Sequence, residues 1–286
     1  MKNNKLFLCL LLTIALLTVT ASADMGPKPS VNVTLDGTDE ICYGTLLSTT
    51  DSYGPHSAWN GEADEAQHAE NKVQPYYSLD YNVWNAFVKY EDADGYYFLQ
   101  QAWILDEENS FTWKYLPPDP FKILLYFPES DTYYSSEVLE RYAFDSYYTV
   151  RVGNGALSVK KSYNYAAEFF TLAIRILLTI SIEIGIALLF FKREKANTLK
   201  FIAKVNITTQ ILLNLVLNLI SFKGGLLAFL FCYFILEIAV WLTETMLYLK
   251  YEKHAPKNKL VLYAFIANAA SFIAGYCFAL IMPEVF

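Results

Sequence analysis

The sequence predicts a multi-domain membrane protein, with an all-β ectodomain of the immunoglobulin-like sandwich type followed by an all-α bundle of four transmembrane helices. Three observations support this fold class. The chain opens with a secretory signal, continues through short aromatic and β-branched runs, and ends in four long apolar runs. The predicted domains are 1–23 for the signal peptide, 24–165 for the extracellular domain and 166–286 for the transmembrane domain.

The N-terminus has the three parts of a signal peptide. Lys2 and Lys5 supply the positive charge, the apolar stretch Leu6–Val19 follows, and Ala21-Ser22-Ala23 forms a small-residue cleavage motif. We therefore expect Asp24 to be the new N-terminus, and the alternative is an uncleaved anchor helix.

Composition separates the chain into two environments. Of 286 residues, 54% are hydrophobic and 18% are charged, below the roughly 25% charge usual in soluble domains. Residues 24–165 hold 22 acidic and 9 basic side chains, whereas residues 166–286 hold 7 acidic and 11 basic ones. This asymmetry indicates two different surroundings, and the acidic first part argues against nucleic-acid binding.

Cysteine usage points to a bacterial surface. Cys42 alone lies in the predicted exported domain, so an internal disulfide is excluded there. A cysteine-poor exported domain suits an envelope without strong oxidative folding, and the Asn- and Lys-rich composition favours a Gram-positive source.

The predicted strands of the ectodomain share aromatic and β-branched residues bounded by turn signals. They are 29–35, 41–48, 83–90, 95–105, 111–116, 121–127 and 144–152. Between them we expect a hairpin turn at Glu91–Gly95, a short exposed helix at 62–71 and a capped helical turn at 135–144.

The predicted spans are 168–191, 199–220, 226–249 and 260–282, each near the ~20 residues that cross a bilayer. Lys192–Lys200 and Lys250–Lys259 are rich in basic residues, while Ser221–Gly225 holds one lysine. By the positive-inside rule the first two loops are cytoplasmic. The ectodomain and the C-terminus are then both extracellular, and the protein is a multi-pass protein of the plasma membrane.

Polar side chains recur every four residues inside these apolar runs, and together they form the predicted intramembrane polar site. Positions four apart share a helix face, and an amide facing lipid would stay unsatisfied, so we expect this face to meet other helices. The second span also carries Asn218, and the fourth a small-residue stripe at Ala267, Ser271 and Gly275. The members of the site are Arg175, Glu183, Asn206, Gln210, Asn214, Glu237, Glu244 and Asn268.

Two interpretations of this site stay open. The amides and charges pack the helices, or the carboxylates handle a cation or proton. Because Arg175 keeps its charge, we expect a carboxylate of another span, Glu237, to lie near it.

The predicted ectodomain has few residues that resemble a catalytic or metal-binding motif. Asp92, Asp94 and Gly95 resemble part of a calcium loop without its remaining ligands, so a solvated turn is the preferred interpretation. His56 with Glu65 and His68 offers an incomplete set of metal ligands. Nucleophile-elbow, zinc-protease and phosphate-loop motifs are missing, so we predict neither an enzyme nor a cofactor.

The ectodomain is rich in tryptophan and tyrosine, which serve either as core or as a recognition surface. Tyr96 and Tyr97, being neighbours on a strand, point to opposite faces, so one ring should lie outside the core. The predicted binding surface comprises Trp59, Tyr96, Tyr97, Tyr133 and Tyr134.

Taken together, these features predict a bacterial cell-surface protein. Its ectodomain binds a protein or envelope ligand, and its polar-cored helices sit in the lipid bilayer and dock a membrane partner or a second copy. The alternative is a transporter or transport-system subunit that uses Glu237 and Glu244 for a cation or proton.

Overall fold

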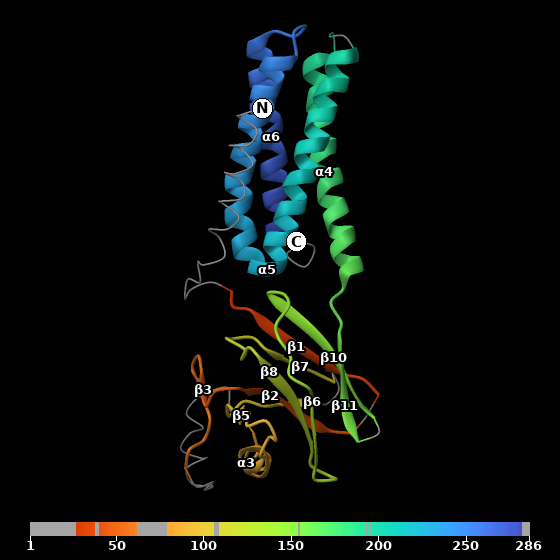
Figure 1. Ribbon diagram of the computed structural model, residues 1–286. Helices are drawn as coiled ribbons and strands as arrows, with labels where there is room; N and C mark the ends of the chain where they lie inside the picture. Colours follow the sequence, from red (N-terminus) through yellow and green to blue (C-terminus); the bar gives the residue numbers. More distant parts are fainter. Residues whose placement is uncertain are drawn as a thin grey trace. The chain divides into compact units, whose positions relative to one another are not determined.

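The computed structural model describes residues 27–37, 40–61, 79–105, 109–153, 155–192, 194 and 196–281. The predicted signal peptide and the predicted helix at 62–71 lie outside these ranges. The chain divides into two compact units, a β-rich one at Lys28–Tyr163 and a helical one that begins at Asn164. A β-sheet region is thus followed by long helices, as the sequence predicts at this level (Figure 1).

The β unit contains two main sheets. The first has the order β11–β10–β1–β7, with β1 parallel to β10 and antiparallel to β7. Its strands are β1 (Ser30–Leu35), β7 (Ser110–Trp113), β10 (Asp145–Gly153) and β11 (Ala156–Lys161). The second has the order β5–β2–β8–β9, with β6 also paired to β2. Its strands are β2 (Cys42–Ser48), β5 (Tyr97–Phe98), β6 (Trp103–Leu105), β8 (Phe121–Phe127) and β9 (Thr132–Ser135). A separate hairpin pairs β3 (Ser52–Tyr53) with β4 (His56–Ser57).

The two main sheets share one apolar core. Val31 and Val33 of β1 contribute to it from the first sheet, and Ile123 and Leu125 of β8 contribute from the second. Cys42 is fully buried in the same core, and burial, together with the charge of Glu40, raises the pKa of its thiol to about 12. The thiol therefore stays protonated at neutral pH.

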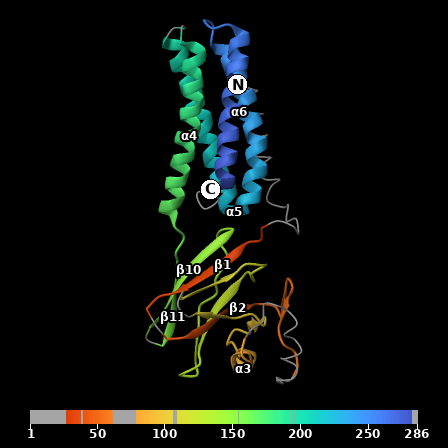
Figure 2. The same ribbon diagram turned by 180° about the vertical axis from the view of Figure 1, so that it is seen from behind.

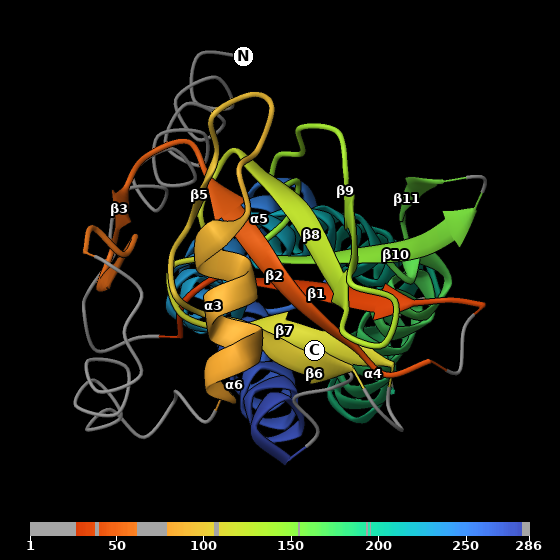
Figure 3. The same cartoon turned by 90° about the horizontal axis from the view of Figure 1, so that it is seen from below.

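All seven residues of β8 are buried, so this strand does not alternate between core and solvent. Its odd-numbered residues belong to the core between the sheets, while Leu124 and Tyr126 pack with helix α3 (Tyr81–Lys89). Figure 3 shows α3 across one face of the second sheet, with β1 and β7 on the other side. The β unit is therefore built of three layers.

Helix α3 corrects the predicted strand at 83–90. Asp80 caps the helix by accepting the Asn82 N–H at 2.8 Å. Val83, Trp84 and Phe87 are its buried residues, at spacings that lie on one helix face. The same apolar residues also fit a strand, because the run is too short for its hydrophobic periodicity to distinguish a helix from a strand.

Three further local predictions need correction. The predicted strand at 95–105 is divided into β5 and β6, and between them Gln100 adopts a positive φ of 60°. The turn at Glu91–Gly95 joins α3 to β5 rather than two strands. Residues 136–144 are not helical: Leu139 pairs with Phe121, and the Ser136 hydroxyl accepts the backbone N–H of Ile123 at 2.8 Å instead of capping a helix.

The helical unit consists of α4 (Tyr165–Phe191), α5 (Ala196–Tyr251) and α6 (Lys257–Ile281). By length and composition these three described helices could each cross a membrane. Helix α5 has 56 residues, or about 84 Å at 1.5 Å per residue, far more than the hydrocarbon thickness of ~30 Å. Gly225 interrupts it with φ 72° and ψ −175°, a conformation that favours glycine.

The two parts of α5, 196–224 and 226–251, fold back on one another. Thr209 contacts Glu244 and Asn206 contacts Tyr248, so the register runs in opposite directions. Figures 1 and 2 show α4, both parts of α5 and α6 side by side.

Candidate functional site in the helical unit

The interior of the helical unit is lined by polar side chains at regular spacing. The buried residues of α4 recur every four positions, and they are Arg175, Thr179, Glu183, Ala187 and Phe191. Asn206, Gln210 and Asn214 in the first part of α5 are buried in the same way. Each helix thus turns one polar stripe away from lipid, because an unsatisfied polar group in hydrocarbon costs several kcal/mol.

Glu183 is fully buried and is held by two neutral donors. Its Oε1 accepts the Gln210 Nε2 at 2.6 Å and the Ser271 hydroxyl at 3.0 Å. Its backbone carbonyl also accepts the Tyr263 hydroxyl at 3.3 Å. Glu183 therefore joins α4, α5 and α6 at one point.

Glu244 is also fully buried, and both of its oxygens have partners. Thr209 donates to Oε1 at 2.5 Å, and the Asn268 Nδ2 donates to Oε2 at 2.7 Å. The single proton of the Ser271 hydroxyl can alternatively go to the Asn268 backbone carbonyl at 3.1 Å, so neighbouring residues of α6 contact Glu183 and Glu244.

Asn206 extends the buried polar interior toward the start of α5. Its Nδ2 donates to the Tyr263 hydroxyl at 2.7 Å, and its Oδ1 accepts the Tyr248 hydroxyl. Both tyrosine side chains are fully buried. This amide therefore bridges the second part of α5 and α6.

Arg175 lies near the opposite end of the amide ladder. Its Nη2 donates to the Asn218 Oδ1 at 2.8 Å, and its guanidinium lies 5.3 Å from the ring centre of Phe229. These described contacts place an amide and an aromatic face at the cation. Asn214, one turn before Asn218, donates instead to the Gln210 carbonyl of its own helix at 2.9 Å.

Glu237 differs from the other two carboxylates. It is 4% exposed, yet neither side-chain oxygen has a hydrogen-bond partner among the described residues. The Tyr233 hydroxyl, one turn earlier, lies near enough to act as a side-chain donor to Glu237, although its position falls outside strict hydrogen-bonding geometry. Glu237 is therefore the least well satisfied of the three carboxylates within the described part of the helical unit.

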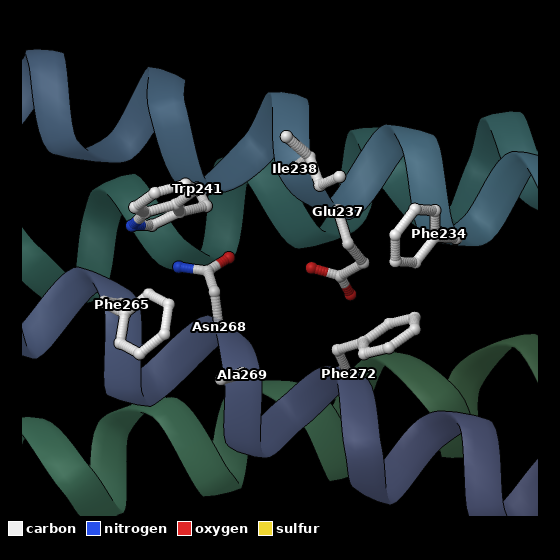
Figure 4. A pocket seen from close by; sticks show the side chains of 8 residues that line it. All are labelled: Phe234, Glu237, Ile238, Trp241, Phe265, Asn268, Ala269 and Phe272. Carbon is white, nitrogen blue, oxygen red and sulfur yellow. The ribbon is translucent and has the colours of Figure 1, made fainter.

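The Glu237 pocket is a cavity of about 120 Å³ between the second part of α5 and α6. Apart from Glu237 and Asn268 its lining is apolar, and it includes Phe234, Trp241, Phe265 and Phe272. Figure 4 shows the Glu237 carboxylate and the Asn268 amide turned toward one another across this space. When it is ionised, a carboxylate surrounded by aromatic rings suits a cation, which binds both to the charge and to ring faces.

The described candidates for metal binding lie in the β unit. Lys122 donates to both oxygens of Asp92 at 3.0 and 2.9 Å and to Asp94 at 2.5 Å, so an ammonium occupies the predicted calcium position. The turn is exposed at Asp94, whose side chain is 66% exposed, so the predicted solvated turn needs correction only at Asp92, whose side chain is 2% exposed. His56 is buried edge-on against Trp113. Burial lowers the pKa of His56, which keeps its imidazole neutral at pH 7.

The other proposed metal ligands, Glu65 and His68, lie outside the described ranges. Among the residues that the structure describes, no cluster of three His, Cys, Asp or Glu side chains could hold a metal ion.

The five aromatic residues of the predicted binding surface are not gathered on one exposed face. Tyr97 is 45% exposed, whereas the other four are partly buried. Trp59 packs edge-on against Trp84, Tyr96 lies beneath the Lys122 ammonium, and Tyr133 stacks on Tyr126. Tyr134 packs against the core between the sheets. Most of these rings thus have internal partners.

The tyrosines of the helical interior are functional candidates that the sequence pattern did not predict. Tyr248 follows Glu244 by four residues and Tyr233 precedes Glu237 by four, which is the spacing that had identified the amides. These hydroxyls were overlooked because tyrosine had been grouped with the hydrophobic residues of each span.

Gly275 leaves space for the side chain of one of these tyrosines, Tyr233. A Cβ added at Gly275 of α6 would lie 2.3 Å from the Tyr233 hydroxyl oxygen, so only a glycine leaves room for it. The small-residue stripe of α6 therefore admits an aromatic side chain of α5 at this position.

Comparison with known proteins adds no relative: no family model, no curated protein and no solved structure matches the chain.

Proposed function

We propose that this chain is a multi-pass protein of the bacterial cell surface that docks a second membrane protein through its helical unit. In this proposal the β unit is an extracellular sandwich of immunoglobulin-like type that binds a protein or envelope ligand. The helical unit crosses the bilayer four times, with α5 turning at Gly225 on the extracellular side. The apolar helices and the basic loops support this arrangement.

One observation carries the docking function. Glu183 and Glu244 each accept well-formed hydrogen bonds within the helical unit, whereas Glu237 has only the loosely placed Tyr233 hydroxyl beside it among the described residues and faces a pocket that opens at the surface of the unit. An ionisable side chain inside a membrane is expensive unless a partner meets it. The surface beside Glu237 is also apolar, since Phe234 and Ile238 are exposed there. Such a surface suits a neighbouring helix.

Site-specific photo-crosslinking in the native membrane tests this function. A photoreactive residue replaces Ile238, which lines the pocket, or Leu189 on α4, which is 79% exposed and serves as the matched control. We expect one discrete protein adduct from position 238 and none from position 189. An adduct of twice the chain mass would identify the partner as a second copy. Identical adduct patterns at the two positions, or lipid adducts alone at both, would contradict the docking function.

Topology is tested by labelling with a membrane-impermeant maleimide. The background carries Cys277→Ser, because Cys277 is the exposed cysteine among the described residues. We expect Lys223→Cys to be labelled in intact cells and Lys253→Cys to be labelled only after lysis. Both positions are exposed in the described chain. Labelling of Lys253→Cys in intact cells would reverse the proposed orientation.

A second candidate function is the transport of a cation or proton. It is favoured by the charge balance of the helical interior, in which three buried glutamates accompany one buried arginine. Reconstituted vesicles with an internal pH-sensitive dye test it. Proton or sodium-driven flux that Glu237→Gln abolishes would support transport, whereas equal flux from empty vesicles would exclude it.

A further inference from the structure

We propose that the Glu237 pocket binds a basic side chain, arginine or lysine, carried at mid-membrane depth by a transmembrane helix of the docked partner. This inference rests on the proposed docking function and names the chemistry of its partner. It is carried by the hydrogen-bonding capacity of the pocket, by its aromatic lining and by its depth.

The unpartnered polar atoms at the Glu237 end of the pocket are acceptors, whereas the Trp241 Nε1–H at the other end is a donor without a partner among the described residues. Asn268 donates through Nδ2 to the Glu244 Oε2 at 2.7 Å and to the Ala264 carbonyl at 2.9 Å. These two acceptors fix the orientation of the amide, since exchanging its oxygen and nitrogen would place oxygen against oxygen. The Asn268 Oδ1 therefore faces the other way, and it has no partner among the described residues.

Three oxygen atoms of described residues consequently share the pocket without a well-formed hydrogen bond, the Asn268 Oδ1 and both carboxylate oxygens of Glu237. Figure 4 shows the amide oxygen on the side of the carboxylate. Acceptors that face one another require hydrogen atoms between them, which come either from a proton on the Glu237 carboxyl or from a donor that enters the pocket. Guanidinium carries five N–H donors and ammonium three, and neither has an acceptor, so both complement this set.

The remaining walls suit the same ligand. Phe234 and Phe272 pack edge-on against one another at the Glu237 end of the pocket, and Trp241 and Phe265 lie at the other end (Figure 4). Aromatic faces within about 6 Å stabilise a lysine or arginine cation, especially where water is absent. Ala269, with a small side chain, also lines the pocket.

The depth of Glu237 along its helix favours a cation carried by a transmembrane helix over a hydrated ion. Glu237 lies 12 residues after Gly225 and 14 before Tyr251, or roughly 18 and 21 Å from the two ends of its helix. This position is close to the middle of the hydrocarbon layer, beyond reach of lipid headgroups. A hydrated ion would have to cross apolar side chains, whereas a transmembrane helix carries its basic residue to this depth with its own apolar neighbours.

The test uses the full chain in lipid vesicles with synthetic transmembrane peptides. Each peptide is a leucine-based helix with arginine, glutamine or leucine at its centre and an acceptor dye at one end. The donor dye is attached to Cys277, which is exposed, while Cys42 and Cys232 are buried. Energy transfer at increasing peptide-to-lipid ratio gives the association constant. We expect the arginine peptide to associate at least about tenfold more strongly than the leucine peptide.

Two variants test separately how the charge and the shape of the pocket contribute to binding. Glu237→Gln removes the charge and should abolish the preference for arginine, whereas Ala269→Leu fills the pocket and should do the same with the carboxylate intact. Glu168→Gln removes a carboxylate of α4 outside the pocket and is the matched control, for which the tenfold preference should persist. Thermal unfolding in the same vesicles verifies that each variant is folded.

The outcomes separate this inference from the docking function. A discrete crosslinked partner at position 238, together with equal association of the arginine and leucine peptides, would overturn the basic side chain and leave docking intact. An arginine preference that survives Glu237→Gln in a folded protein would also overturn it. The pocket binds a small cation, and the inference is wrong, if sodium or dodecylamine saturates it and the arginine peptide associates no more strongly than the leucine peptide.

Discussion

Replacing Lys122 with methionine should destabilise the β unit more than any change at the surface. The Lys122 ammonium is 6% exposed and donates to both oxygens of Asp92, whose side chain is 2% exposed. Its contact with Asp94 lies at the surface, because that side chain is 66% exposed. Methionine keeps most of the apolar stem of lysine and removes the charge.

The magnitude follows from what the substitution leaves behind. Asp92 would remain buried with two backbone donors, the N–H groups of Asp94 at 3.0 Å and Tyr96 at 3.4 Å. Breaking a buried ion pair by removing one partner costs about 3–5 kcal/mol. The exposed Asp94 contact contributes about 0–1 kcal/mol. We therefore expect Lys122→Met to lower the free energy of unfolding by about 3–5 kcal/mol.

Tryptophan emission during urea unfolding of the full chain in nanodiscs measures this change. Four of the five tryptophans, Trp59, Trp84, Trp103 and Trp113, belong to the β unit, so the signal reports mainly on it. Asp94→Asn should cost less than about 1 kcal/mol. Adding Asp92→Asn to Lys122→Met should recover at least half of the loss, because no lone charge then remains buried. A double variant as unstable as the two single losses added together would refute the reasoning.

The pH dependence of the same pair has a definite sign. Burial lowers the pKa of Lys122, but hydrogen bonds from its ammonium to Asp94 and Asp92 and their charges outweigh burial and raise it. A folded-state pKa above the unfolded value means that the stabilisation is complete below the unfolded value and is lost as pH rises through the folded one. The penalty of Lys122→Met should therefore stay constant between about pH 7 and 9 and shrink only above about pH 10.5, near the ordinary lysine pKa.

Three other outcomes are expected. A fragment of residues 28–163 should be soluble, β-rich by circular dichroism and indifferent to reductant, whereas a mainly helical spectrum would contradict the two-sheet fold. Gly44→Ala should destabilise it by about 1–3 kcal/mol, because the new Cβ would lie 2.5 Å from the Phe111 ring; unchanged urea unfolding would show that the ring moves freely. Arg175→Leu and Asn218→Ala should each lower the melting temperature in detergent and should not add when combined, since they remove the same 2.8 Å hydrogen bond. Additive losses would show that the contact does not couple the two residues.

Local patterns in the sequence predicted most of the long strands, and the reasons for the misses are physical. The stretches at 29–35 and 121–127 became β1 and β8 because they concentrate β-branched and aromatic residues. The stretch at 83–90 has the same composition, yet Asp80 supplies an N-cap and the second sheet offers an apolar face to cover. That face is formed by residues far along the chain, so no local pattern could reveal the helix.

In the polar interior, too, some features follow from the local sequence and others depend on distant parts of the chain. A spacing of four residues predicted which side of each helix turns inward, because this depends on helix geometry alone. Which donor meets which acceptor depends on the rotation and relative height of neighbouring helices. The link from Gln210 to Glu183 and that from Asn268 to Glu244 join helices at heights that the sequence does not specify.

The amide ladder of α5 explains why one carboxylate is left over. Asn206 serves two tyrosines, Gln210 serves Glu183, Asn214 serves a carbonyl of its own helix, and Asn218 serves Arg175. Glu244 obtains its donors from Thr209 and Asn268, outside the ladder. Every amide of the ladder is thus engaged, and none donates to Glu237. If Glu237 existed only to pack the helices, an apolar residue would fill its place at lower cost, because a buried carboxylate without well-placed donors stabilises nothing. The docking proposal assigns this carboxylate to a group that arrives from outside the helical unit, and Glu237→Leu should therefore stabilise the isolated protein in detergent while abolishing association with the arginine peptide. A protein that is less stable in detergent with leucine at position 237 would show that the carboxylate already has a partner within the chain.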